Sequence, residues 1–339
     1  MELTFHPLDL ALRVPFTIAR GTQLTAENVL VTLTDGENTG IGEAAPADHY
    51  GELRPSVLAY LEALCPYLAE GDDIAVTTLH AVMDGVARLN PAAKAGVDMA
   101  LYDLLGKRLG APVYQILGID ARNTPLTSFT IGIDEPSIMA RKAAEADAYP
   151  ILKVKVGTNR DRANLEAIRA ARPDATIRID ANEAWTPKEA VERIEELAVF
   201  DLELVEQPVD GRDLDGLGFV TSAVPLPVIA DESCIVPDDV PLVAPHVDGI
   251  NIKLMKCGGM YPALQMIATA RALHLKVMMG CMIESSVAIT AAAQLSPLLD
   301  YADLDGNLLI ARDPYRGATV EAGRLQLPTS PGLGLHTNE

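Results

Sequence analysis

Three acidic residues recur at a nearly constant interval near the middle of the sequence. Asp180, Glu206 and Asp231 are 26 and 25 residues apart, and each ends a short apolar run typical of a β-strand. One acid at such a place is commonly a helix cap or a solvated loop carboxylate. Three in succession predict that oxygen ligands converge on one point, and a site without His or Cys suits Mg²⁺ or Mn²⁺ rather than zinc.

Lysines flank these acids on both sides. In the run ILKVKV at residues 151–156, Lys153 and Lys155 point to one face of a strand and the apolar residues to the other. An edge strand that carries solvated lysines is the competing interpretation of this run. Lys253 lies at the end of a later run, DGINIKL.

Together these groups suit the removal of a proton next to a carboxylate. A lysine that acts as a base must be neutral near pH 7, so its pKa must lie some three units below the ordinary value of about 10.4. A cation about 4 Å away supplies roughly 4 kcal/mol toward that shift. We therefore expect Lys153 and a divalent metal to make Lys155 basic. The metal would stabilise the enediolate, one lysine would take the proton, and a lysine on the opposite face would return one.

Eight short strand-like runs, most of them followed by a helical pattern, provide the elements that position these residues. The runs are 126–132, 151–156, 175–180, 202–208, 227–233, 248–254, 276–280 and 301–306. Their spacing of roughly 20–27 residues predicts an α/β fold, a (β/α)8 barrel of the TIM type. An open doubly wound sheet is the alternative, but no GxGxxG loop follows the first strand. Strands two and six of a closed barrel lie across the axis, which predicts that Lys155 and Lys253 face each other.

The sequence before the barrel has a different pattern. Two alternating runs with a turn-forming Asp35-Gly36 predict an antiparallel meander, and helical stretches follow at 53–71 and 92–110. We therefore expect an α+β capping domain over 1–123 and a barrel over 124–315. Residues 316–339 contain no further βα unit and are expected to pack back on the capping domain.

Composition excludes several classes of protein. Of the 339 residues, 49% are hydrophobic and 22% charged, and no apolar run is long enough for a transmembrane helix. The N-terminal stretch lacks the apolar region of a signal peptide. The four cysteines form no CxxC pair, which indicates reduced thiols in a cytoplasmic protein. A net charge of −20 argues against nucleic acid or an anionic membrane as partner.

Six motifs together resemble one known family over essentially the whole chain. LKVKVG, RIDANEAW, LVEQPV, IADESC, NIKLMKCGG and MGCMIESS are similar to the muconate-lactonizing-enzyme subgroup of the enolase superfamily, in which a Lys or His base works with Mg²⁺. The resemblance implies a modified barrel with a capping domain and a homo-oligomer. It also implies one Mg²⁺ per subunit, replaceable by Mn²⁺, on the three acids, with Lys155 and Lys253 as acid/base pair. Lys153 would hold the substrate carboxylate.

The resemblance extends to further residues around the site. Asn182, Glu232 and Glu284 would lie close behind the metal or the substrate. Asp303 and Asp305 in YADLDG alternate at the end of the eighth strand and so share a face. This DxD is similar to that of the dipeptide epimerases, where it receives the free α-ammonium of the peptide. A pair of loop aspartates is the simpler alternative.

The stretch FTIARGTQ at residues 16–23 resembles a loop of the L-Ala-D/L-Glu epimerases. The resemblance implies L-Ala-D/L-Glu of murein-peptide origin as the substrate, epimerised by 1,1-proton transfer at the α-carbon of the C-terminal residue. Arg20 would pair with the glutamate side chain, and an exposed loop arginine is the alternative. Tyr50, Met282 and Ile283 are expected to contact the substrate. Competing functions are N-succinylamino acid racemase, muconate-type cycloisomerase, o-succinylbenzoate synthase, an epimerase of hydrophobic or cationic dipeptides, and a barrel that only senses a metal or metabolite.

Overall fold

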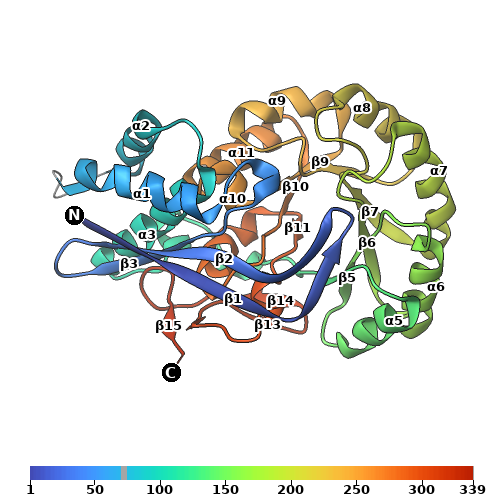
Figure 1. The fold of residues 1–339 in the computed structure, drawn as a ribbon, viewed down its shortest axis with the longest axis horizontal. Helices are drawn as coiled ribbons and strands as arrows, with labels where there is room; N and C mark the ends of the chain where they lie inside the picture. The colour runs from blue at the N-terminus through green and yellow to red at the C-terminus, as the bar shows by residue number, and fades with distance from the viewer. Residues whose placement is uncertain (70–74, 339) are drawn as a thin grey trace.

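The computed structural model describes residues 1–69 and 75–338. Its N-terminal part is the antiparallel sheet β1 (Glu2–Ile18), β2 (Gly21–Thr34) and β3 (Thr39–Ala44), in the order β1-β2-β3. β1 and β2 form a long hairpin that extends from the capping end of the molecule toward the barrel strands (Figure 1). The predicted meander is confirmed, and the hairpin places residues 19 and 20 at its turn.

α1 (Arg54–Ala69) and α3 (Pro91–Leu109) pack against this sheet, and α2 (Val76–Val86) packs against both of these helices. The short α4 (Val113–Ile116) follows α3. Gly40 and Gly42 allow α3 to approach β3 closely, because a Cβ at either position would come within 1.9 Å of a helix carbonyl oxygen. The two predicted helices are confirmed, although residues 70 and 71 of the first lie outside the described residues. α2 was not predicted, because its first turn, Val-Thr-Thr, is β-branched and gives a weak helical signal.

Eight parallel strands follow. They are β4 (Phe129–Ile131), β5 (Ile151–Lys155), β6 (Thr176–Asp180), β7 (Leu202–Glu206), β8 (Val228–Ala230), β9 (Gly249–Ile252), β10 (Lys276–Met279) and β11 (Tyr301–Ala302). They pair in chain order from β4 to β11. A parallel bridge between Thr127 and Ala302 brings the two ends of the sheet together. The predicted barrel is confirmed, and the edge-strand interpretation of 151–156 is wrong because β5 pairs with both β4 and β6.

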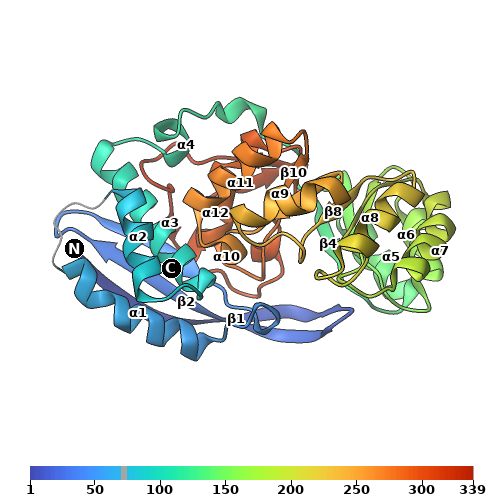
Figure 2. The ribbon, with the colours of Figure 1, turned by 90° about the horizontal axis from the view of Figure 1, so that it is seen from above.

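Helices connect successive strands of the barrel. They are α5 (Pro136–Glu145), α6 (Asp161–Ala171), α7 (Pro187–Leu197), α8 (Leu214–Ala223), α9 (Val240–Val243), α10 (Leu254–Cys257), α11 (Met260–Ala272) and α12 (Ser286–Gln294). Short 3-10 turns are η1 (Asp48–Tyr50), η2 (Ala121–Asn123), η3 (Ala198–Phe200), η4 (Pro237–Asp239), η5 (Ala244–His246), η6 (Ser296–Leu298) and η7 (Gly306–Leu308). From above, α5–α8 lie at one end of the molecule, α1 and α2 at the other, and α10–α12 between them (Figure 2).

The C-terminal segment contacts both parts of the protein. It contains the pairs β12 (Tyr315–Arg316) with β15 (His336–Thr337) and β13 (Thr319–Glu321) with β14 (Arg324–Gln326). Val113 donates a hydrogen bond to the Gly332 carbonyl at 3.0 Å, and the Leu333 N–H donates to Asp103 of α3 at 2.7 Å. The Thr124 hydroxyl, just before the barrel, donates to the Leu325 carbonyl. The domain limits 1–123, 124–315 and 316–339 stay a prediction, and residue 339 lies outside the described residues.

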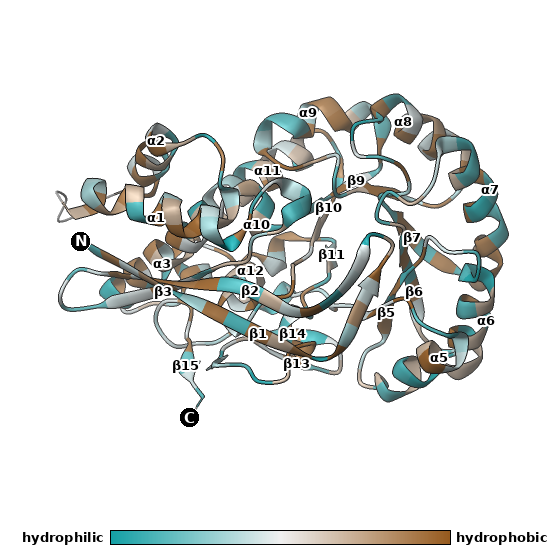
Figure 3. Ribbon diagram, in the orientation of Figure 1, coloured by the Kyte–Doolittle hydropathy of each residue, from teal (hydrophilic) through white to brown (hydrophobic). Residues whose placement is uncertain are grey.

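Brown apolar and teal polar segments are mixed along the outer helices (Figure 3), and the buried residues include Leu165 and Ile168 of α6 and Ile194 and Leu197 of α7. One buried cluster runs continuously from Leu3 in β1 to Leu333 near the C-terminus, so the capping sheet and the barrel share a core. Within the described residues, every helix is too short or too polar to cross a membrane.

Candidate active site

The two lysines of β5 are buried and face carboxylates. Lys153 Nζ lies 2.7 Å from Asp303 Oδ2, 2.8 Å from Glu206 Oε2 and 3.1 Å from Asp180 Oδ2. Lys155 Nζ lies 2.6 Å from Asp180 Oδ2. Burial alone would lower the pKa of Lys153, but the three carboxylates raise it well above its ordinary value. Lys153 is therefore a fixed positive charge in the floor of the site.

The three predicted metal ligands stand at neighbouring strand ends. Asp180 and Glu206 are direct register partners at the ends of β6 and β7, Asp231 follows β8, and all three are fully buried. Burial would raise the pKa of Asp180, but Lys155 and Lys153 lower it below its usual range. Burial and the charge of Asp180 raise the pKa of Glu206 to about 8.

Lys253, which directly follows β9, and Lys256 of α10 both face Asp231. Lys253 Nζ lies 2.7 Å from Asp231 Oδ2, and Lys256 Nζ lies 2.6 Å from Oδ1. Burial would lower the pKa of Lys253, and Asp231 raises it well above its ordinary value. Lys256 was missed by sequence reasoning, although it stands in the NIKLMKCGG motif. It is fully buried and also donates to the carbonyl oxygens of Asp231, Cys234 and Asn251.

Two amide side chains, also missed, hold the acids in place. Asn251 Nδ2 donates to Glu206 Oε1 at 2.8 Å. Gln207 Oε1 accepts from the Asp231 N–H at 2.8 Å, and Gln207 has a positive φ of 32°. A residue other than glycine in this region is uncommon and often marks a functional site. The signal that could have found them is their place in the quoted motifs. Gln207 directly follows Glu206 in LVEQPV, and Asn251 opens NIKLMKCGG.

The donor set fits a hard divalent cation. Asp180, Glu206 and Asp231 offer oxygen ligands from a buried position. Three side chains around the acids have a buried oxygen that accepts no hydrogen bond within the described part of the chain: Asn182 Oδ1, Glu232 Oε2 and Asn251 Oδ1. Buried oxygens short of donors are what ligation of Mg²⁺ or Mn²⁺ requires.

Asp303 and Asp305 come together as predicted, held by β4 and the residue before it. Ser128 Oγ donates to Asp303 Oδ1 at 2.6 Å, and the Thr130 N–H donates to Asp305 Oδ2 at 2.6 Å. Burial would raise the pKa of both carboxyl groups. Lys153 nevertheless lowers that of Asp303, whereas burial and the charge of Asp303 raise that of Asp305 to about 7.

One cavity of about 720 Å³ collects most of the predicted residues. Those that line it are Arg20, Tyr50, Lys153, Lys155, Asn182, Lys253, Met282, Ile283, Asp303 and Asp305. Glu284 lies behind the wall, where its Oε1 accepts from the Met282 N–H at 2.8 Å. Burial, followed by the charge of Glu43, raises the pKa of Glu284 to about 8.

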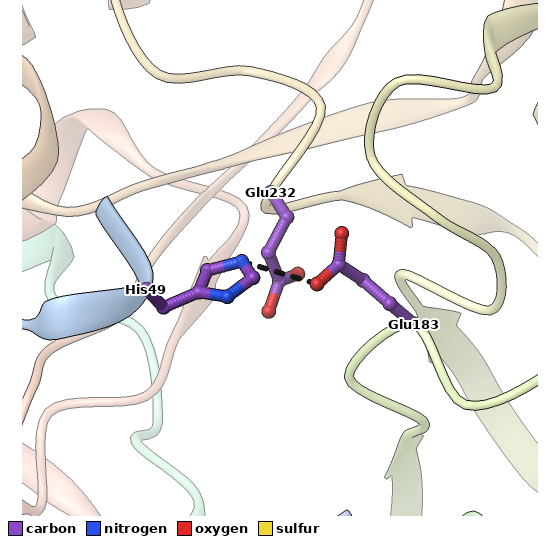
Figure 4. Close-up of side chains that lie close together, drawn as sticks. All are labelled: His49, Glu183 and Glu232. Carbon is purple, nitrogen blue, oxygen red and sulfur yellow. Dashed lines mark ion pairs between the residues drawn. The ribbon is translucent and has the colours of Figure 1, made fainter. Parts of the chain in front are cut away.

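Arg20, at the turn of the β1–β2 hairpin, reaches barrel carboxylates. Its NH1 lies 2.7 Å from Glu232 Oε1 and 3.0 Å from Glu183 Oε2, and donates to the Asn182 carbonyl. His49 Nε2 lies 3.1 Å from Glu183 Oε2 (Figure 4). The β1–β2 hairpin and the loop that carries His49 are thus both anchored on Glu183.

His49, Glu183 and Glu232 bring ligand atoms within 4.8 Å of one another, as a metal site would. The guanidinium of Arg20 already pairs with both glutamates, so we assign this cluster to loop anchoring. The three strand-end acids are not gathered that tightly among the described residues. Lys153 stands between Asp180 and Glu206 and pairs with both.

Tyr50 ends η1 and lines the cavity. Glu52 fixes this loop by accepting from the Ala92 N–H of α3 at 2.8 Å. The Tyr50 hydroxyl is buried and has no hydrogen-bond partner among the described residues. A buried hydroxyl without a partner is unusual and points to a ligand.

A capped barrel whose cavity sets buried lysines against buried carboxylates defines an enzyme of the enolase type. Residues 2–118 match the mandelate racemase / muconate lactonizing enzyme N-terminal domain, and residues 138–339 match the enolase C-terminal domain-like family. The chain belongs to the mandelate racemase / muconate lactonizing enzyme family, which confirms the resemblance found in its motifs.

Named relatives are epimerases. The L-Ala-D/L-Glu epimerase of Bacteroides thetaiotaomicron is 42% identical, and the match covers 99% of this chain and 88% of that protein. The dipeptide epimerase of Enterococcus faecalis, solved with Mg and L-Leu-L-Tyr, is 39% identical with a TM-score of 0.91 over 98% of both chains. The substrate-liganded L-Ala-D/L-Glu epimerase of Bacillus subtilis is 35% identical with a TM-score of 0.92, over 99% of this chain and 98% of that one.

Proposed function

We propose that this enzyme is a Mg²⁺-dependent dipeptide epimerase that acts on L-Ala-D/L-Glu. One observation carries the proposal: Lys155 of β5, Lys253 directly after β9, and two buried aspartates all line the same cavity. β5 and β9 are the second and sixth of eight strands, so they stand on opposite sides of the barrel. A base on each side of one carbon is what inversion of its configuration requires.

Asp180, Glu206 and Asp231 are the residues that would hold Mg²⁺. When bound, the metal supplies positive charge to a substrate carboxylate and stabilises the enediolate that forms beside it. The Enterococcus faecalis relative was solved with Mg, which supports a metal in this site.

The lysines of the chain move the proton. Lys155 removes it from, or returns it to, one face of the substrate α-carbon, and Lys253 acts on the other face. Lys153, held cationic by its three carboxylates, binds the substrate carboxylate.

Asp303 and Asp305 select a substrate with a free α-ammonium group. Two buried carboxylates 2 residues apart at one strand end offer strong, charge-assisted acceptors to such a cation. N-succinylamino acids, muconate and succinylbenzoate carry no ammonium there, and binding them would leave the aspartates unpaired. These observations favour a dipeptide over the substrates of the alternative reactions.

Arg20 provides the preference for a glutamate side chain. All of its hydrogen bonds to described residues leave from NH1, so its NH2 and Nε groups remain for a substrate carboxylate. A hydrophobic preference is the second candidate, because the Enterococcus faecalis relative binds L-Leu-L-Tyr.

Deuterium exchange tests the function directly. The protein with Mg²⁺ and L-Ala-L-Glu in D₂O should place deuterium at the glutamate α-carbon and form L-Ala-D-Glu. Lys155→Ala and Lys253→Ala should each abolish epimerisation, whereas Lys276→Ala, at an exposed lysine, serves as the matched control. Exchange into N-succinylamino acids but not into any dipeptide would refute the assignment.

We also propose that the enzyme works in the cytoplasm on peptides released from murein, as a homo-oligomer. Its four free cysteines fit a reducing compartment. Light scattering coupled to size-exclusion chromatography gives the molar mass, and a mass of one chain would refute the oligomer.

A further inference from the structure

Glu43 is a buried carboxylate that lies outside the cavity and links the capping sheet to the barrel. It stands near the end of β3 and is fully buried. Its partners belong mainly to residues more than 240 positions later in the chain: Ser285 donates to it through both its N–H and its hydroxyl, and Ala288 through its N–H. Asn28 of β2 supplies a further donor at 2.7 Å.

These bonds place Glu43 at the N-terminus of α12. Ser285 is the N-cap of this nine-residue helix, and its hydroxyl also accepts from the Val287 N–H. A negative charge at the first turn of a helix interacts favourably with its unpaired N–H groups and its dipole. A side chain of the capping sheet therefore caps a barrel helix.

The segment that leads into this helix forms a wall of the cavity. The wall loop, residues 281–285, supplies Cys281, Met282 and Ile283 to the lining. Asn28 Nδ2, which bonds Glu43, also donates to the Ile283 carbonyl at 3.0 Å. The Ile283 side chain packs in a small cluster with Leu10 and Ala26 of the β1–β2 hairpin.

Glu43 thus holds the wall loop at two points, directly at Ser285 and through Asn28 at Ile283. Both of its oxygens face donors: Oε1 accepts from Asn28 and Ser285, and Oε2 from Ser285 and Ala288. A glutamine has only one acceptor oxygen, so in either orientation its NH₂ group would face an N–H donor. The loop must shift to relieve that contact.

We propose that Glu43 is a positioning residue that fixes the wall loop and thereby sets the preference of the enzyme for the side chain of the second residue of the dipeptide. The inference rests on the proposed function, because Met282 and Ile283 are taken to contact that side chain. Glu43 itself touches neither substrate nor metal.

The test compares Glu43→Gln and Ser285→Ala with Glu37→Gln, which lies at an exposed position in the β2–β3 turn of the same sheet. The rate constant kcat/KM is measured for L-Ala-L-Glu and L-Ala-L-Leu, and Mg²⁺ affinity by calorimetry. We expect Glu43→Gln to change the ratio of the two kcat/KM values about fivefold or more while the Mg²⁺ affinity stays within about twofold. Glu37→Gln should change neither.

A ratio within about twofold of the parent in both Glu43→Gln and Ser285→Ala would overturn the inference, even if the variants unfold at lower temperature. That result would give Glu43 a purely structural role. If Glu43→Gln does not fold, Ser285→Ala alone decides, because it keeps the N–H donor to Glu43 and removes only the hydroxyl. Failure of the proposed function gives a different result from failure of this inference, because the parent enzyme would then epimerise no dipeptide at all.

Discussion

Lys153 Nζ lies 2.7 Å from Asp303 Oδ2, so the side chain proposed to hold the substrate carboxylate is ion-paired with one proposed to hold the substrate ammonium. Their pKa values shift apart, with that of Lys153 raised and that of Asp303 lowered, which keeps both charged near neutral pH. A zwitterionic dipeptide carries the same two opposite charges. It can therefore exchange partners with this pair without leaving a buried charge uncompensated.

Asp303→Asn removes the negative charge but keeps the shape of the side chain. We expect kcat/KM for L-Ala-L-Glu to fall about 100-fold, because a charge-assisted hydrogen bond of about 2–3 kcal/mol to the ammonium is lost. Ser128→Ala, which removes only the neutral donor to Asp303, should cost about fivefold. Steady-state kinetics of both variants measure this. Asp303→Asn kinetics close to those of the parent would show that the ammonium binds elsewhere.

Arg20→Met separates two roles of one guanidinium. If its NH2 and Nε groups bind the glutamate side chain, kcat/KM for L-Ala-L-Glu should fall about 30-fold in this variant. The kcat/KM for L-Ala-L-Leu should stay within about threefold of the parent value. Glu183→Gln weakens the anchor of the loop without removing the guanidinium, and should affect both dipeptides alike. Equal losses on both dipeptides in Arg20→Met would assign Arg20 to loop anchoring alone.

Tyr50→Phe removes a buried hydroxyl that has no partner among the described residues. Because such a group costs about 1–3 kcal/mol, we expect the free energy of unfolding to stay equal or to rise. Activity on L-Ala-L-Glu should nevertheless fall about tenfold, because the hydroxyl is proposed to donate to the bound substrate. Urea unfolding and kinetics on the same sample give both values. Undiminished activity would remove Tyr50 from the list of substrate contacts.

The sequence predicts the barrel site well because parallel register converts chain distance into spatial distance. Lys155 and Asp180 are direct register partners, as are Asp180 and Glu206. One βα unit separates each pair, so residues at a constant interval line up along one rim of the sheet. Lysines and acids at those intervals could therefore be placed together without any knowledge of the tertiary structure.

Contacts between the capping sheet and the barrel have no such rule. Arg20, at the turn of the β1–β2 hairpin, meets Glu232 across 212 residues, and Glu43 of β3 meets Ser285 across 242. No periodicity in the sequence fixes where these two strand segments meet the barrel. The contact of Lys256 with Asp231 was not predicted for a local reason. It follows Lys253 by three residues, within the single turn of α10, and that turn brings its ammonium group back to Asp231.

Lys256→Met tests how much this buried lysine contributes to stability. Lys256 Nζ has four oxygen partners, and its loss leaves carbonyl groups and one oxygen of Asp231 without a donor. We expect the free energy of unfolding to fall by about 3 kcal/mol, as when a buried ion pair loses one partner. Lys276→Met, at a half-exposed lysine paired with Asp300 at 3.5 Å, should cost under about 1 kcal/mol. Similar losses in both variants would contradict the role given to Lys256.

Glu284→Gln should change how stability depends on pH. Burial and the nearby charge of Glu43 raise the pKa of Glu284 from 4.5 to about 8, while the N–H of Met282 and the charge of Lys253 oppose the shift. Between these values the folded protein keeps a proton that the unfolded chain has released, so rising pH favours unfolding. Relative to Glu284→Gln, the parent should lose a few kcal/mol of unfolding free energy as pH rises through this interval, at about 1.4 kcal/mol per pKa unit. Above pH 8 the difference should level off.

Urea titrations of the parent and of Glu284→Gln between about pH 5.5 and 8.5 measure this difference, because both proteins then differ by one ionisable group only. The carboxyl group contributes stability in its protonated form, in which it no longer repels Glu43 behind the wall loop. If the unfolding free energies of the parent and of Glu284→Gln instead differ by a constant amount across this range, Glu284 is ionised in the folded protein as it is in the unfolded chain. The charge of Lys253 would then outweigh burial, and the cavity wall would carry one more negative charge toward the substrate.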